Sequence, residues 1–163
     1  LNQSDYVRIA GCNHRSERFA MSYILDPDDR KEEIVNSISH DLGLKVVVSN
    51  SKVEDLTAAP KDRIQMPVED WLNSAYYSSY IITDSFHACV FSLIFHKPFL
   101  VFGNAARGMA RFATLLETFG QSQRLLFKAD DYNKNNNYPS FEHTDEIFSK
   151  LRDKAYQFLN SAL

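Results

Sequence analysis

The sequence is poor in the residues that mark several classes of protein. Cysteine occurs only twice, at Cys12 and Cys89, with no CxxC or Cys/His ligand spacing, so a structural zinc site is not indicated. Glycine and proline number only five each among 163 residues, which argues against a linker or a low-complexity chain. We therefore expect a globular domain with two reduced thiols, as is usual in the cytoplasm.

Excess positive charge and long apolar runs are also absent. The net charge is −3, so there is no basic field of the kind that attracts nucleic acid or anionic membranes. The most apolar stretch, residues 88–103, is interrupted by His96, Lys97 and Pro98 and is shorter than the ~20 residues of a membrane span. The chain also begins without methionine, and we expect it to be a piece of a longer polypeptide.

Short β-rich runs alternate with segments of helical periodicity along the whole chain. This pattern predicts an α/β domain, Rossmann-like, with a mostly parallel sheet and helices on both faces. We expect strands at 19–25, 45–49 (buried), 80–83, 99–102 and 124–127, helices at 28–42, 68–78, 84–95 and 109–119, a loop at 128–140 and a terminal helix at 141–163. Ligands of such sheets bind beyond the carboxyl ends of the strands, so residues 83–85 and 103–108 are the informative loops.

The first constellation is the segment Thr83-Asp84-Ser85-Phe86-His87, between a strand and a helix. Asp84 or Ser85 can cap the helix, and the remaining N–H groups with the positive end of the helix dipole form an anion site. His87 then lies in the first helical turn beside that anion, which suits an acid/base role. The alternative is that these residues are only caps and that His87 is a core histidine.

The second constellation follows the next strand, from Gly103 to Arg111. Gly103 and Gly108 permit tight turns and a close backbone approach to a ligand. Arg107 and Arg111, four residues apart, can share a helix face, and guanidinium forks match phosphate or carboxylate. Together with His87 they predict a site for a small anionic ligand, although a solvated arginine or a surface ion pair is the alternative for each alone.

The segment from Tyr80 to Phe95, followed by Lys97-Pro98-Phe99, resembles the signature of the polysaccharide pyruvyl transferase family. The sequence departs from that signature at Cys89, where a small residue is usual. The resemblance extends from about Tyr23 to Leu126. Its further matches are Tyr23–Asp26, Val68–Leu72, Arg107-Gly108, Arg111-Phe112, Leu115-Leu116 and Arg124-Leu125.

The resemblance implies transfer of pyruvate from phosphoenolpyruvate to a pair of sugar hydroxyls, forming a ketal on a cell-surface polysaccharide, such as an exopolysaccharide, or its precursor. It also implies that residues 1–163 form the C-terminal, donor-binding lobe of a GT-B-like fold. The N-terminal lobe is then missing, and the isolated fragment is expected to be inactive. The expected partners are phosphoenolpyruvate, a lipid- or nucleotide-linked glycan acceptor and the missing lobe, in the cytoplasm or at the inner face of the membrane.

With this resemblance, His87 is the expected general acid or base. Substrate binding is expected from Asp84, Ser85, Arg107, Gly108 and Arg111. We expect no cofactor and no metal, because phosphoenolpyruvate is itself the donor. Two other functions fit the same residues: a glycosyltransferase domain that binds a nucleotide-sugar, and a non-catalytic domain that binds sugar or a partner.

Overall fold

A five-stranded parallel sheet forms the centre of the protein in a computed structural model, which describes residues 2–11, 17–51, 56–103, 108–127, 132 and 138–162. The order across the sheet is β2-β1-β3-β4-β5, and every neighbouring pair is parallel. The strands are β1 (Phe19–Tyr23), β2 (Lys45–Val48), β3 (Tyr80–Thr83), β4 (Phe99–Phe102) and β5 (Leu125–Leu126). The predicted α/β class with a parallel sheet is confirmed.

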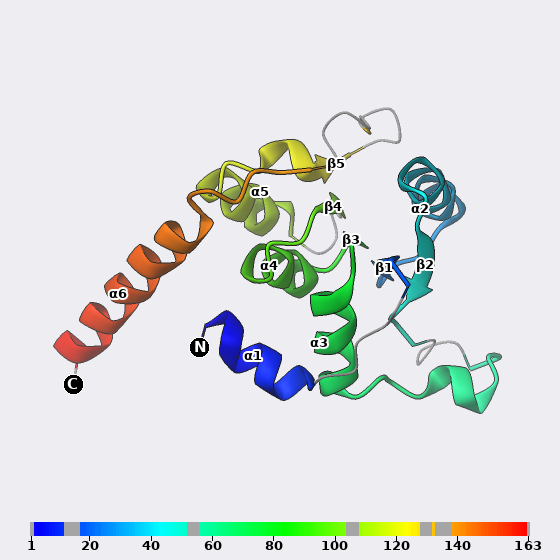
Figure 1. Cartoon of the computed structure of the whole chain (residues 1–163), viewed down its shortest axis with the longest axis horizontal. Coiled ribbons are helices and arrows are strands. Elements are labelled where there is room, and N and C mark those ends of the chain that lie inside the picture. Colours follow the sequence, from blue (N-terminus) through cyan, green and yellow to red (C-terminus); the bar gives the residue numbers. More distant parts are fainter. Residues whose placement is uncertain are drawn as a thin grey trace.

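Helices cover both faces of this sheet, as predicted. Figure 1 shows α2 on one side of the strands and α3, α4 and α5 on the other. The helices are α1 (Gln3–Ala10), α2 (Asp29–Leu42), α3 (Val68–Tyr77), α4 (Phe86–Ile94), α5 (Met109–Thr118) and α6 (Thr144–Ala162), with 3₁₀ turns at Pro60–Arg63 and Ser122–Arg124.

The two faces of the sheet build two apolar clusters. Met21 of β1 and Ile81 of β3 belong to the cluster beneath α3, α4 and α5. Ala20 and Ile82, their neighbours along the strands, belong to the cluster that includes the apolar face of α2. This division follows from the alternation of side chains along a strand, and it buries the central strands on both sides.

The strand predicted at residues 45–49 is found as β2, but the prediction that it is buried is wrong. β2 is the first strand in the sheet order, so it pairs with β1 alone. Its end residues Lys45 and Val48 are exposed, and Val48 keeps 63 % of its surface accessible. A β-branched run does not reveal whether a strand lies at the edge of a sheet or in its centre, because both positions favour these side chains.

Helix α1 was not predicted from its sequence. It begins with a capping box in which the Asn2 side chain accepts a hydrogen bond from the Asp5 N–H, and the Asp5 carboxylate accepts one from the Asn2 N–H. The N-x-x-D spacing was the available signal. The helix packs against α3, and Tyr6 meets the ring of Phe91 edge-on at 5.0 Å.

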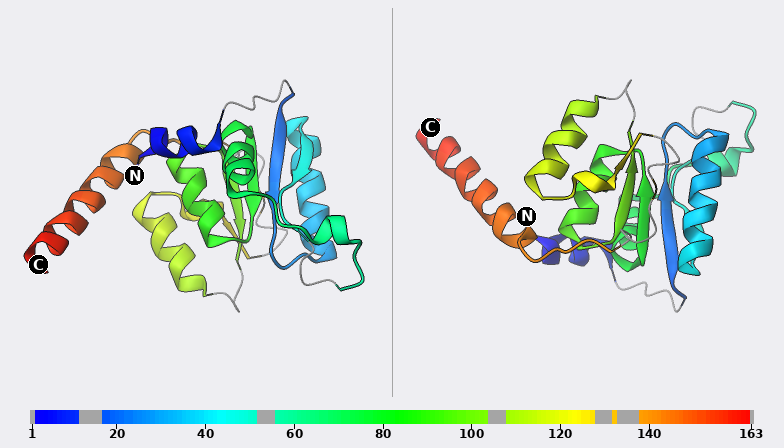
Figure 2. Two further views of the ribbon diagram at one scale, coloured as in Figure 1. Left: turned by 90° about the horizontal axis from the view of Figure 1, so that it is seen from below. Right: turned by 90° about the horizontal axis from the view of Figure 1, so that it is seen from above.

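Helix α6 leaves the body of the protein and projects away from it (Figures 1 and 2). Ile147 and Phe148 in its first turns pack against the core, but every residue from 151 to 162 is exposed. The large apolar side chains of Leu151, Phe158 and Leu159 on this part of the helix are therefore exposed. Within the described part of the chain, none of the helices is both long and apolar enough to span a bilayer.

Candidate active site at the carboxyl edge of the sheet

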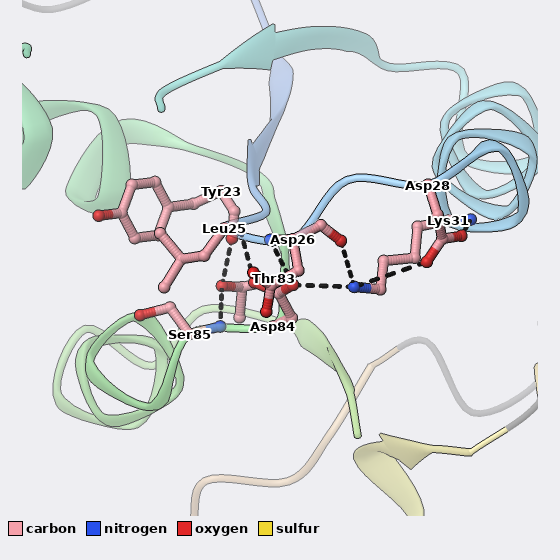
Figure 3. Close-up of polar contacts among 8 residues, drawn as sticks. All are labelled: Tyr23, Leu25, Asp26, Asp28, Lys31, Thr83, Asp84 and Ser85. Atoms are coloured by element: carbon pink, nitrogen blue, oxygen red, sulfur yellow. Dashed lines mark hydrogen bonds and ion pairs between the residues drawn. The ribbon is translucent and has the colours of Figure 1, made fainter. Parts of the chain in front are cut away.

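The order of the strands reverses direction between β1 and β3, so the turns that follow these strands meet at one edge of the sheet. Thr83, the last residue of β3, ties the turns together. Its buried hydroxyl donates to the Tyr23 carbonyl and accepts the Ser85 N–H at 2.9 Å (Figure 3). The predicted loop 83–85 thus lies at the position where such sheets bind ligands.

The Asp84 carboxylate reaches across this edge to the β1–α2 turn. It accepts the backbone N–H of Leu25 at 2.7 Å and that of Asp26 at 3.1 Å. It also accepts a hydrogen bond from the Lys31 ammonium at 3.0 Å (Figure 3). Because its oxygens are engaged there, Asp84 does not cap α4, and neither does Ser85, whose side chain makes no capping bond. The prediction of a side-chain cap from either residue is wrong.

The first turns of α4 and α5 lack the negative charges that the other sheet helices carry. Neither has an acidic residue in its first turn, and neither N-cap, Ser85 or Gly108, makes a side-chain capping bond. By contrast, α2 is capped by Asp28 and has Asp29 and Glu32 in its first turn, and the first turn of α3 also holds two acidic residues. The positive ends of the α4 and α5 dipoles are therefore the ones left to attract an anion.

His87 lies in the first turn of α4 and is exposed, so it is not a core histidine. Its ring lies 6.3 Å from that of Phe86, centroid to centroid. The Arg111 guanidinium stacks over the ring of Phe86, 5.2 Å from its centroid. The structure thus brings Arg111 and His87 next to the same aromatic side chain, Phe86.

Gly108 begins α5 beside Arg111. Its φ of 88° is a conformation that favours glycine, and a Cβ atom there would lie 3.5 Å from Arg111 Nε. Arg107 lies outside the described residues. Across the described ranges, no group of three or more His, Cys, Asp or Glu side chains converges as a metal site would require.

The model of the polysaccharide pyruvyl transferase family matches residues 2–105, more than half of the chain, including Thr83 to His87. The chain belongs to this family. No curated protein and no solved structure matches it. The family match begins earlier than the resemblance drawn from the sequence and ends before Arg107, Gly108 and Arg111. Gly108 and Arg111 are therefore placed beside the family motif by the geometry of the α5 N-terminus.

In this member of the family, two residues at the candidate site were not singled out from the sequence, Lys31 and Phe86. Phe86 stands inside the quoted motif, next to His87, but nothing in the sequence indicated that Arg111 would stack on it. Lys31 lies 53 residues before its partner Asp84, so only the packing of the β1–α2 turn brings them together.

Arg124, another residue of the resemblance, contacts a buried tyrosine of β3. It is 3 % exposed just before β5, and its guanidinium hydrogen-bonds the hydroxyl of Tyr80, the first residue of β3. Burial lowers the pKa of Arg124, whereas the contact with Tyr80 raises it.

Proposed function

We propose that this chain holds the donor in an enzyme that transfers pyruvate from phosphoenolpyruvate to two hydroxyls of a sugar. The observation that carries the proposal is the exposed His87 of the family motif, in the first turn of a helix with neither a side-chain cap nor an acidic residue. Phosphoenolpyruvate carries a phosphate and a carboxylate. Two such helix ends and Arg111 suit both groups.

The reaction needs two proton movements, and His87 is placed to carry them. One hydroxyl oxygen bonds to C2 of phosphoenolpyruvate while C3 gains a proton and becomes a methyl group. The second hydroxyl oxygen then bonds to C2, the C2–O bond to phosphate breaks, and phosphate leaves with the remaining hydroxyl proton. His87 acts as the acid or base for these transfers, and the helix N–H groups with Arg111 stabilise the negative charge on the departing phosphate.

The acceptor in this proposal is a lipid- or nucleotide-linked precursor of a cell-surface polysaccharide. The polysaccharide acceptor class follows from the family. We place the reaction in the cytoplasm, at the inner face of the membrane when the acceptor is lipid-linked. A further lobe of the polypeptide binds that acceptor, and the 163 residues alone do not turn over.

Replacing His87 tests this proposal. In the polypeptide that includes the acceptor-binding lobe, His87→Gln should lower the rate of ketal formation on the order of 10²–10⁴-fold, because general acid–base catalysis contributes about that much. Mass spectrometry of the glycan measures the product. The thermal midpoint should stay near that of the unchanged protein, because His87 is exposed.

His40→Gln on α2 is the matched control, since His40 is also an exposed helix histidine, with 92 % of its side chain accessible. It should leave the rate unchanged. A His87→Gln enzyme that forms ketal at the unmodified rate would remove His87 from the mechanism. That result would favour the alternative in which the 163-residue domain binds sugar or a partner and takes no part in catalysis.

A further inference from the structure

The Lys31 ammonium is enclosed by acceptors from its own protein. It hydrogen-bonds Asp84 Oδ2 at 3.0 Å and the Asp26 carbonyl, and lies 3.8 Å from Asp28 Oδ2. Only 12 % of the Lys31 side chain is exposed. Two of the three ammonium donors are used in these hydrogen bonds, and the nearby Asp28 carboxylate adds an ion pair, so the contacts of Lys31 are with its own protein.

The Asp84 carboxylate is equally committed. It is buried, with its side chain 0 % exposed, and accepts hydrogen bonds from two backbone N–H groups and from Lys31 (Figure 3). Its contacts therefore suit a structural link between two turns better than the substrate-binding role expected from the sequence.

This link joins the elements that build the candidate site. Lys31 and Asp28 belong to the start of α2, Leu25 and Asp26 to the turn after β1, and Asp84 stands two residues before α4. The Thr83 hydroxyl, bonded to the Tyr23 carbonyl and the Ser85 N–H, makes a second tie beside it. The two ties join the carboxyl ends of β1 and β3, and the first turns of α4 and α5 are the neighbouring helix starts without an acidic residue.

We infer that Lys31 and Asp84 are a positioning pair, which fixes the first turn of α4 and so the placement of His87 for the donor. The inference rests on the proposed function for its donor, but the coupling to His87 holds in the absence of ligand. Removing one member leaves the other charge buried without its partner, so the turn must rearrange. Removing both residues should weaken donor binding by less than the sum of the two single changes, because the pair acts as a unit.

The test uses the 163-residue chain and the variants Lys31→Met, Asp84→Asn and the two combined. Nuclear magnetic resonance follows the His87 ring signal without ligand, and calorimetry follows phosphoenolpyruvate binding at a temperature where every variant is folded. We expect a shifted His87 signal in both single variants. The donor dissociation constant should rise on the order of ten- to a hundredfold, with non-additive effects in the double variant.

Lys45→Met is the matched control, because Lys45 pairs with Glu17 on the exposed edge of the sheet. Lys45→Met should change neither the His87 ring signal nor the donor dissociation constant. Single variants that melt earlier but keep the His87 signal and donor affinity would reduce the pair to a structural brace and overturn the inference. Lost affinity with an unmoved His87 signal would also overturn it, since Lys31 would then contact the donor directly.

Failure of the proposed function can be distinguished from failure of the positioning role. If the unmodified chain does not bind phosphoenolpyruvate, that function fails, and the ligand-free His87 signal alone decides the positioning role. A signal that shifts in Lys31→Met and Asp84→Asn but not in Lys45→Met supports the pair. A signal unmoved in all three variants overturns it.

Discussion

Thr83, Asp84 and His87 stand within five residues of one another, yet each meets a different environment. Thr83 and Asp84 are buried and bond to the β1–α2 turn, whereas His87 faces solvent. The sequence order strand, polar residues, helix was enough to place all three at the carboxyl edge of the sheet. Their separate environments could not be predicted, because they depend on Lys31 and Leu25, which only the tertiary packing brings near.

Cys89 provides a test at the same scale. It lies on the buried face of α4 with no accessible surface, and burial raises the pKa of its thiol to about 12. The reactive form is the thiolate, so at pH 8 the folded protein should present almost none at this position. Of the two thiols predicted to be free, Cys89 is confirmed and Cys12 lies outside the described residues. We expect Cys89 to be inert as well.

The measurement is labelling with a thiol reagent at pH 8 in a Cys12→Ser background, which leaves Cys89 as the only cysteine. The native protein should react far more slowly than the same protein in denaturant. Because the folded-state pKa is raised to about 12, the native rate should still climb above pH 10, where the rate of an ordinary thiol has levelled off. Labelling of the native protein as fast as the denatured one would contradict this burial.

At the scale of elements, periodicity predicted the helices well, and their ends depended on local capping. The predicted helix 28–42 is found as α2, with Asp28 at its N-cap and Gly43, at φ 61°, at its end. The predicted helix 84–95 is shorter in the structure because Asp84 and Ser85 remain in the turn. The anion-attracting character of α4 and α5 emerges only when their first turns are compared with those of α2 and α3.

Helix α6 permits a prediction about stability. Residues 151–162 are all exposed, so deleting residues 151–163 removes no core contact. The thermal midpoint should stay the same within error, while circular dichroism should lose only the signal of this segment. An unsupported helix of that length is marginal in water and adds little to the fold.

Phe148→Ala is the contrasting variant, since Phe148 packs against the core and meets Phe119 at 4.6 Å between ring centroids. It should lower the free energy of unfolding by roughly 1–3 kcal/mol, less than for a fully buried aromatic residue because Phe148 is only partly buried. A large fall in the midpoint of the truncated chain would mean that the outer part of α6 stabilises the domain after all.

For the whole molecule, the alternation of strands and helices predicted the parallel sheet, and the order β2-β1-β3-β4-β5 then set where a ligand can bind. The edge position of β2 could not be predicted, because it depends on strands distant in sequence, whereas α1 had a local signal in the N-x-x-D spacing of its capping box. Family membership supplies the reaction class, and the uncapped helix ends supply the place for an anion. The central claim is that this place takes phosphoenolpyruvate.

Ligand-dependent thermal denaturation of the 163-residue chain tests that claim most directly. Phosphoenolpyruvate should raise the melting temperature, because a ligand at 100 times its dissociation constant stabilises the folded state by about 2.7 kcal/mol. Uridine and guanosine diphosphate sugars should not raise it. Arg111→Ala should weaken the effect of phosphoenolpyruvate without lowering the melting temperature of the free protein, since Arg111 is exposed. Stabilisation by a nucleotide-sugar and none by phosphoenolpyruvate would contradict the account and indicate a glycosyltransferase donor site.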